Sequence, residues 1–220
     1  MADKEILIFV EGPRDKVFLE VYLYFLGNFP IKNFKVKDVK GKDNLSKRLL
    51  EIEKYDKTLI IFDADIKKES QESDAGFDNK LKHIHEKFQE KGIDFPKEQI
   101  FLFPNNQDDG DLETLLFKIA KHDEFLKCFE GYLECIKSKE PYKPIKKIRK
   151  SKWHAYLEAF CLTDLYIKDV FDSKGKIKSR YEENYKKLTE EVIDFNSNSL
   201  VPLKNFLGQF AENKQKTNLF

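Results

Sequence analysis

Short runs of apolar residues alternate with longer stretches of helical spacing through the first half of the chain. The runs at residues 6–10, 58–62 and 100–103 are continuously apolar or β-branched, and a short run of mixed polar and apolar residues occupies residues 35–39. Continuous runs of this kind are typical of strands buried on both faces of a parallel sheet. The sequence therefore predicts four strands in this half.

Between the predicted strands, apolar residues recur every three or four positions, which is the spacing of one helix face. Helices are expected after Asp15, around Leu45, Leu49 and Ile52, and from Phe77 to Phe88. Strands that alternate with helices are joined by right-handed crossovers and pair in parallel. We therefore predict an α/β fold, with a four-stranded parallel sheet flanked by helices.

From Asp111 onward the strand pattern disappears and only helical spacing remains. A basic, proline-containing connection occupies residues 137–150. Helices are predicted over residues 112–119, 125–136, 153–171, 181–195 and 203–210. We accordingly divide the chain into an α/β domain, residues 1–120, and a helical C-terminal extension, residues 121–220, packed on it.

Composition limits the kinds of partner and the location that we expect for this protein. The 220 residues carry 40 Lys and Arg against 39 Asp and Glu, a formal net charge of +1, so only a local basic patch would attract nucleic acid. Neither a signal peptide nor an apolar segment of membrane-spanning length is recognisable. Cys128, Cys135 and Cys161 form no CxxC pair and lie at apolar positions of helical patterns. We expect buried free thiols and a cytoplasmic location without membrane contact.

The strand at residues 58–62 runs directly into two carboxylates, Asp63 and Asp65, separated by one small residue. If strand geometry continues to Asp65, both side chains point to one side at the carboxyl edge of the sheet, where open α/β sheets bind ligands. Like charges held there repel each other unless a cation lies between them or one is protonated. Mg2+ takes such oxygen ligands, although a helix-capping or turn role for one Asp explains the pattern equally.

Other strand ends and helix starts supply further acids. Glu11 directly follows the first strand, Asp15 opens the next helix, and Asp111 and Glu113 follow the fourth strand. Three of them have a structural alternative: Asp15 as a first-turn carboxylate in the helix dipole, Asp111 as an N-cap, and Glu113 as the residue that closes a capping interaction. A carboxylate directly after a buried strand is harder to explain structurally, so Glu11 indicates function.

Together these motifs resemble those of Toprim domains. That family has a strand followed by Glu-Gly and an acidic residue that opens a helix, here Glu11-Gly12 and Asp15. It also has a strand that ends in Asp-x-Asp, here Asp63 and Asp65. The resemblance covers about the first half of the chain and implies a Toprim-like fold with metal-dependent phosphodiester chemistry.

The later part resembles the OLD (overcoming lysogenization defect) nucleases and stand-alone Toprim proteins. Those place Leu-Glu at a helix start after the fourth strand, here Asp111-Leu112-Glu113, and carry a lysine further on, which Lys152 matches. The resemblance implies catalytic roles for Glu11 and for Lys152, whose charge would reach the carboxylates and neutralise a phosphate. It also implies a metal pair with Glu11 and Asp15 on one side, Asp63 and Asp65 bridging or flanking it, and Asp111 and Glu113 on the other side.

The basic connection supplies candidate nucleic-acid-binding residues: Lys146, Lys147, Arg149 and Lys150. Lysine-rich connections are most often solvated and bind nothing. Beside a site of carboxylates, with Tyr142 and Trp153 adjacent, the same stretch would bind phosphates or stack a base. The sequence leaves both interpretations open.

Two functions fit these observations. The first is a Mg2+- or Mn2+-dependent nuclease that cleaves DNA or RNA phosphodiesters. The second is a metal-binding Toprim subunit without strong catalysis that works with a separate ATPase, since no G-x-x-x-x-G-K-[ST] stretch occurs in the sequence. Primase and topoisomerase accessory domains are not recognisable either, so we expect an enzyme here to be minimal or to need a partner.

Overall fold

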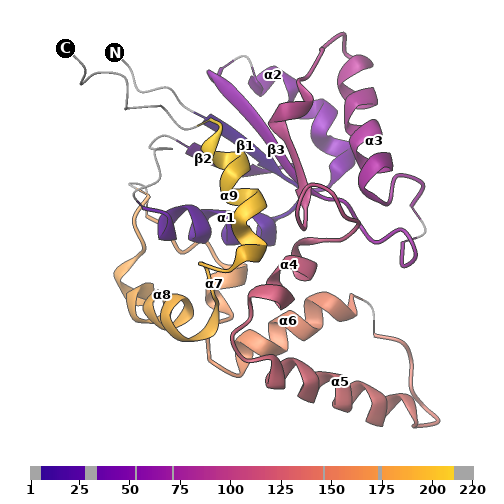
Figure 1. The fold of residues 1–220 in the computed structure, drawn as a ribbon, viewed down its shortest axis with the longest axis vertical. Coiled ribbons are helices and arrows are strands. Elements are labelled where there is room, and N and C mark those ends of the chain that lie inside the picture. Colours follow the sequence, from indigo (N-terminus) through magenta and orange to yellow (C-terminus); the bar gives the residue numbers. More distant parts are fainter. Residues whose placement is uncertain are drawn as a thin grey trace.

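The sheet at the centre of the molecule is four-stranded and all-parallel, with the order β2-β1-β3-β4 (Figure 1). The computed structural model describes residues 6–27, 34–52, 54–70, 72–145, 147–172 and 175–210. The strands are β1 (Ile6–Val10), β2 (Phe34–Asp38), β3 (Lys57–Asp63) and β4 (Ile100–Phe103). The α/β class, the four predicted strands and their parallel pairing are confirmed.

Helices connect the strands and make up most of the chain after β4. In the first half they are α1 (Pro13–Phe25), α2 (Leu49–Ile52) and α3 (Phe77–Gln89), with 3-10 segments at Lys42–Arg48 and Lys97–Gln99. After β4 come α4 (Leu112–Ile119), α5 (Asp123–Lys137), α6 (Ile148–Glu158), α7 (Asp164–Ile167), α8 (Glu182–Lys187) and α9 (Val201–Gly208). The 3-10 segments here are Ser179–Tyr181 and Asn198–Leu200, and Leu188–Val192 is a π-helical turn. Within the described ranges, no helix combines the length and apolar character needed to cross a membrane.

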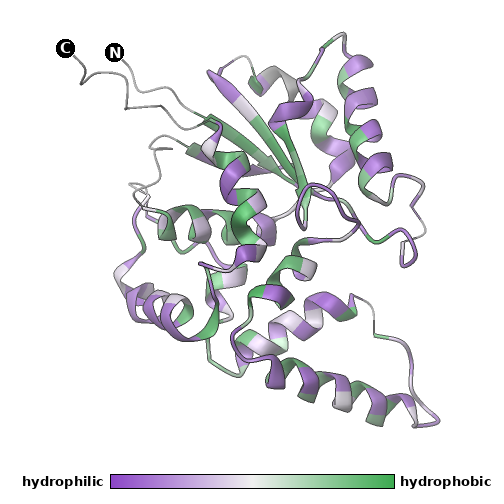
Figure 2. Ribbon diagram, in the orientation of Figure 1, coloured by the Kyte–Doolittle hydropathy of each residue, from purple (hydrophilic) through white to green (hydrophobic). Residues whose placement is uncertain are grey.

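Alternate residues of each strand enter hydrophobic clusters on opposite faces of the sheet. On one face, Leu7 and Phe9 of β1 pack in a cluster with Ile84 and Phe88 of α3. On the other, Ile8 and Val10 belong to a larger cluster that includes α1 and α4. Figure 2 shows β1 and most of β3 as hydrophobic, as expected when both faces are covered. The edge strand β2 is more polar and only partly buried.

The larger cluster also includes the helices that follow α4. It contains Trp153 of α6, Leu165 of α7, Val192 of the π-helical turn and Leu207 of α9, together with the residues of β1. The sheet and the C-terminal helices therefore bury their apolar side chains in one continuous core on this face.

One long helix predicted from spacing is wrong, and a second ends earlier than predicted. The segment from Trp153 towards Phe171 divides into α6 and α7, because Cys161 adopts a left-handed φ of 59° and Leu162 donates to the carbonyl of Leu157. This 6→1 hydrogen bond is typical of the Schellman motif, which ends a helix and most often has glycine as its left-handed residue. The predicted helix over residues 181–195 is present as a continuous helical segment, formed by a 3-10 turn, α8 and a π-helical turn, but it ends at Val192, before the predicted end.

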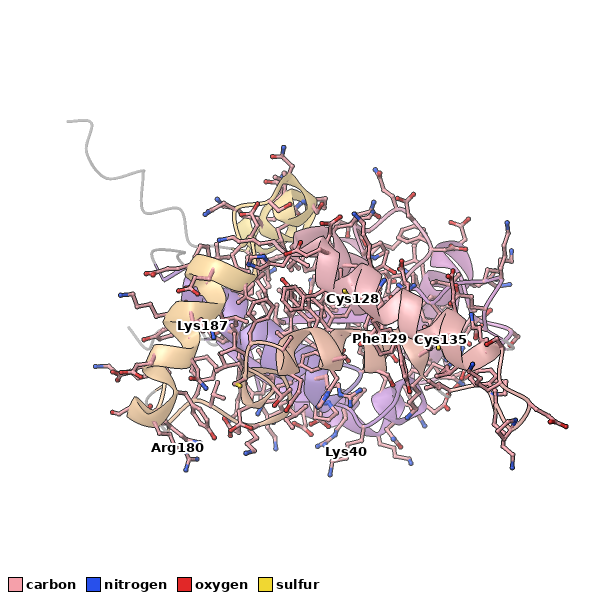
Figure 3. All side chains as sticks on the ribbon, turned by 90° about the horizontal axis from the view of Figure 1, so that it is seen from below. Lys40, Cys128, Phe129, Cys135, Arg180 and Lys187 are labelled. Atoms are coloured by element: carbon pink, nitrogen blue, oxygen red, sulfur yellow. The ribbon has the colours of Figure 1, made fainter. Side chains whose placement is uncertain are left out.

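The expected burial of the cysteines is also wrong. Cys128, Cys135 and Cys161 are free and exposed, and Figure 3 shows the first two along α5, which lies at the lower end of the molecule in Figure 1. Leu126 and Leu133 are the residues of α5 that become buried. Cys128 and Cys135 fit the apolar spacing of this helix but lie outside the buried stripe that contains Leu126 and Leu133.

Candidate active site

The candidate site lies where the chain changes direction across the sheet. β1 and β3 are neighbours, and their next strands, β2 and β4, lie at opposite edges. Open α/β sheets bind ligands at such a switch point, beyond the carboxyl ends of the strands. Val10 pairs with Ile61, so Glu11 and Asp63 follow this pair at the same end of adjacent strands. We use the name acidic edge for the carboxylates gathered here: Glu11, Asp15, Asp63, Asp65 and Glu113.

Asp63 is the most crowded carboxylate of the acidic edge. It is the last residue of β3, only 8% of its surface is exposed, and its Oδ1 accepts a hydrogen bond of 2.8 Å from the backbone N–H of Leu112. Burial, reinforced by the negative charges of Asp15 and Glu11, holds the pKa of Asp63 well above its usual range. A buried carboxylate among like charges favours a proton or a cation.

Glu11 and Asp15 share this environment. Burial raises the pKa of Glu11 to about 7 against the opposing charge of Lys80. It raises the pKa of Asp15 to about 6 against the opposing charge of Lys150. Asp15 also accepts a 2.8 Å hydrogen bond from the N–H of Gly12 and completes a capping box at the start of α1. The structural role considered for Asp15 is therefore real, and its carboxylate still faces the acidic edge.

Glu113 is buried and does not close a capping interaction, so that expectation is wrong. Thr114 occupies the position that does, and its backbone N–H and hydroxyl both donate to Asp111. Glu113 is 2% exposed, its Oε1 accepts a 2.7 Å hydrogen bond from the Tyr166 hydroxyl, and its Oε2 has no hydrogen-bond partner among the described residues. Burial raises the pKa of Glu113, although the charge of Lys150 opposes the rise.

Asp111 is the N-cap of α4, as expected, and it is also held by an arginine. The Nε and one terminal nitrogen of Arg149 donate to its two oxygens at 2.9 and 2.8 Å. Burial alone would raise the pKa of Asp111, but these bonds and the bond from Thr114 bring it below its usual value. Both oxygens are thus engaged, which distinguishes Asp111 from the crowded carboxylates of the acidic edge.

Asp65 does not continue the geometry of β3, so the expected side-by-side placement with Asp63 is wrong. The strand ends at Asp63, and Asp65 has a left-handed φ of 65°. Its backbone bridges to Gly110, and its side chain meets Lys80 of α3. Asp63 and Asp65 therefore face different neighbours, with Glu11 close enough to be influenced by both.

Lys80 is the site residue that the sequence analysis missed. Its side chain is fully buried, and its Nζ lies 2.6 Å from Asp65, 3.2 Å from Asp74 and 3.7 Å from Glu11. Burial alone would lower the pKa of Lys80, but the surrounding carboxylates raise it instead, so the ammonium stays charged. Lys42 pairs with the other oxygen of Asp74.

A signal for Lys80 was present in the sequence. The apolar face of the predicted helix contains Phe77, Ile84 and Phe88. Lys80 is three residues after Phe77 and four before Ile84, so it lies on that buried face. A lysine on the apolar face of a helix needs a buried anion, and the nearest unexplained anions were those after β3.

The loop before α4 fixes the backbone of Asp65. Gly110 donates to the carbonyl of Asp65 at 3.1 Å and has a φ of 155°. A Cβ added to Gly110 would lie 2.9 Å from both Pro104 and Thr114. The close approach of three chain segments therefore requires glycine at this position.

Lys150, rather than Lys152, is the lysine of α6 whose charge acts on the acidic edge. Burial alone would lower the pKa of Lys150, but the charges of Glu113 and Asp63 raise it. The expected approach of Lys152 to these carboxylates is wrong: its Nζ pairs with Glu130 and lies 4.8 Å from the ring centre of Phe117.

The remaining residues of the basic connection differ in their surroundings. Lys147 is exposed, Arg149 is bound to Asp111, and Lys146 lies outside the described residues. Trp153 is 1% exposed and packs in the core, so the expectation that it could stack a base is wrong.

Comparison with protein families matches residues 5–212 to one family, described as Protein of unknown function (DUF3226). The chain belongs to DUF3226. None of the curated proteins and none of the solved structures compared with the chain matches it. The DUF3226 match includes the sheet and the helices after it, so Lys80, Lys150 and all of the acidic edge fall within the family region.

The donor chemistry of the acidic edge in this DUF3226 chain suits a hard divalent cation. All of the side chains that could bind an ion here do so through carboxylate oxygens. One buried oxygen each of Glu11 and Glu113 forms no hydrogen bond with the part of the chain that the structure describes, although that of Glu11 lies 3.7 Å from Lys80. Among the described residues, no three His, Cys, Asp or Glu side chains already surround one point as a metal-binding group. Glu11, Asp15, Asp63 and Glu113 are the residues that would hold an ion, whereas Asp65 is already paired with Lys80.

Proposed function

We propose that this DUF3226 protein is a Mg2+- or Mn2+-dependent nuclease that cleaves nucleic-acid phosphodiesters at the acidic edge, in the manner its Toprim-like motifs imply. One observation carries the proposal above the rest. Asp63 is a buried carboxylate at the switch point of the sheet, held among the like charges of Asp15 and Glu11. A cation bound here would relieve the repulsion between these carboxylates, which the fold brings close together.

The chain's own residues would divide the work in this site. Glu11 and Asp63, fixed at the ends of adjacent strands, would bind the ion, with Asp15 and Glu113 beside them. A bound divalent ion supplies an activated water and stabilises the oxygen that leaves the phosphate. Lys80 pairs with Asp65 and fixes its side chain in place, on the side of the site that is next to Glu11.

Lys150 takes the position that the family resemblance suggested for Lys152. It is attracted by Glu113, Asp63 and Asp15, so its charge lies where a phosphate bound at the acidic edge would arrive. We propose that Lys150 neutralises charge that builds on that phosphate. A cytoplasmic location is part of the same proposal, supported by the three free, exposed thiols.

The test combines ion binding with cleavage. Calorimetry with Mn2+ should show binding to the wild type and at least a tenfold loss of affinity for Asp63→Asn. The substitution makes neutral a carboxylate that would bind the ion directly. Asp78→Asn is the matched control, because Asp78 is an exposed aspartate in the first turn of α3. The same proteins are then incubated with supercoiled DNA and with single-stranded RNA, in Mn2+ or in EDTA.

Each outcome decides between the candidate functions. Cleavage by the wild type and by Asp78→Asn in Mn2+, but not in EDTA and not by Asp63→Asn, supports the nuclease. Mn2+ binding that depends on Asp63 without any cleavage supports the alternative, a metal-binding subunit that works with a separate ATPase. Equal Mn2+ binding by the wild type and Asp63→Asn rules out the metal site.

A further inference from the structure

A pocket with a basic lining lies next to the acidic edge. It has a volume of about 360 Å3, and its lining residues are Arg14, Lys147, Lys150, Ser151, His154 and Ala155. We call it the basic pocket. Three of these side chains are basic, two others can donate hydrogen bonds, and no described lining residue is acidic. Such a lining is suited to an anion.

The basic pocket and the acidic edge share one wall. Lys150 lines the pocket, and its charge is also felt by Glu113, Asp63 and Asp15. Arg14 lines the pocket from the first turn of α1, directly before Asp15. An anion in the pocket would therefore be separated from the proposed site of cleavage only by the residues of this shared wall.

The start of α6, which forms the other side of the pocket, has the wrong charges for a helix N-terminus. Lys147 is its N-cap in a left-handed conformation, makes no capping bond through its side chain, and is followed by Arg149 and Lys150. No acidic residue lies in the first turn of this 11-residue helix. Cations near the positive end of a helix dipole are unfavourable, whereas an anion there is stabilised.

The cations of this stretch are not equally compensated. Arg149 is bound to Asp111, and Lys150 faces the acidic edge. Lys147 is exposed and forms no ion pair with any residue that the structure describes. Its charge is therefore available to a ligand, and Ser151 and His154 line the same pocket.

We infer that the basic pocket binds a phosphate group of a nucleic-acid strand, next to the phosphate that is cleaved. This inference rests on the proposed function for the identity of its ligand, because the adjoining carboxylates would act on a phosphodiester. Neighbouring phosphates of one strand would then contact the basic pocket and the acidic edge together. Lys147 contributes a point charge, Arg14 a planar pair of donors, and Ser151 a hydroxyl.

Strand binding without metal tests the inference directly. Fluorescence anisotropy is measured with labelled single-stranded DNA and RNA 12-mers in EDTA, over a series of salt concentrations. Lys147→Gln removes the charge and keeps most of the stem; it should weaken binding about threefold or more and flatten the slope of log affinity against log salt by about 0.7. Lys143→Gln is the matched control, since Lys143 is exposed in the same connection and does not line the pocket.

The result distinguishes this inference from the proposed function. Because neither metal nor cleavage is needed, a protein that fails the Mn2+ test can still show binding that depends on Lys147. If Lys147→Gln binds both strands with the affinity and salt slope of the wild type, the inference is overturned even when cleavage is observed. It is also overturned if inorganic phosphate binds in a Lys147-dependent way while neither strand binds.

Discussion

The Nζ of Lys80 lies 2.6 Å from Oδ2 of Asp65, and the lysine side chain is completely shielded from solvent. The pair joins the N-terminal part of α3 to the turn after β3, so it ties the position of Asp65 to the packing of a helix. Asp74 and Glu11 complete the surroundings of the ammonium group at 3.2 and 3.7 Å. Lys80 therefore provides part of the positive charge that the carboxylates around β1 and β3 need in order to be buried together.

Replacement of Lys80 by methionine should destabilise the protein strongly. The variant keeps a similar apolar stem but leaves Asp65 and Asp74 without their buried cation. Removing one partner of a buried ion pair typically costs about 3–5 kcal/mol. Urea unfolding in EDTA, followed by circular dichroism, measures this loss.

Lys82→Met is the control for this change. Lys82 lies two residues further along α3, is 76% exposed, and pairs with Glu86 at 3.7 Å. An exposed pair of this kind contributes little, so the control should change the free energy of unfolding by less than about 0.5 kcal/mol. Equal effects of the two substitutions would show that burial of Lys80 does not matter.

Substitution of glycine by alanine should have opposite effects on stability at Gly110 and at Gly131. Gly110→Ala places a Cβ 2.9 Å from Pro104 and Thr114 at a φ of 155°, so it should destabilise the protein by about 2 kcal/mol or more. Gly131→Ala in α5 meets nothing within 4 Å and should stabilise the protein by about 0.5–1 kcal/mol. Thermal unfolding of both variants checks the signs, and a stable Gly110→Ala would mean that the loop can move away from Asp65.

The sheet could be predicted from the sequence because strands buried on both faces leave continuous apolar runs. The ends of the C-terminal helices could not. Apolar residues keep their helical spacing from Trp153 to Leu165, while the chain breaks between them at Cys161. The left-handed residue that ends a helix is most often glycine and sometimes asparagine, so a cysteine at this position does not indicate a helix end in the sequence. The helical spacing alone therefore predicted one helix where the structure has two.

The carboxylates at the strand ends were found because a parallel sheet brings those ends together. Their pairing with cations was not found, since it depends on segments far apart in the chain. Lys80 reaches Asp65 across 15 residues, and Arg149 reaches Asp111 across 38. The sequence pointed to a lysine at the acidic edge but named Lys152 in place of Lys150. These two residues are two positions apart on α6 and so face different sides of the helix.

Stability should fall with rising pH because of Glu20. Burial raises the pKa of Glu20 from 4.5 to about 7, although Lys16 lies 3.6 Å away and opposes the rise. A carboxyl whose pKa is higher in the folded state binds its proton more tightly when folded. Its contribution is therefore most favourable below about pH 4.5 and is lost as the pH rises through about 7.

Glu20→Gln should remove this dependence. The side chain of Glu20 is 17% exposed, so the effect is smaller than the full shift implies, and we expect the variant to be about 1–2 kcal/mol more stable than the wild type at pH 8. At pH 5 the two proteins should be nearly equal. Glu86→Gln is the control, since Glu86 has the same spacing from Lys82 as Glu20 from Lys16 but is 54% exposed. A gain for Glu86→Gln as large as for Glu20→Gln would contradict the burial argument.

Asp63→Asn should make the metal-free protein more stable while it removes Mn2+ binding. The new side chain keeps an oxygen that can accept the 2.8 Å bond from Leu112, and its amide group can donate to the carboxylates nearby. The substitution removes a buried charge whose neighbours Asp15 and Glu11 repel it, so the free energy of unfolding at pH 8 in EDTA should rise by about 1–3 kcal/mol.

Mn2+ should reverse this order of stability. An ion that binds only the folded wild type stabilises it according to its concentration and affinity, and the variant should gain nothing. Melting temperatures of both proteins, with EDTA and with millimolar Mn2+, provide the comparison, and Asp78→Asn should follow the wild type in both. If Asp63→Asn is the less stable protein in EDTA, the attraction of Asp63 to Lys150 outweighs its repulsion by the other carboxylates. The acidic edge would then be a balanced structural network, and the strain that motivates a metal site would be absent.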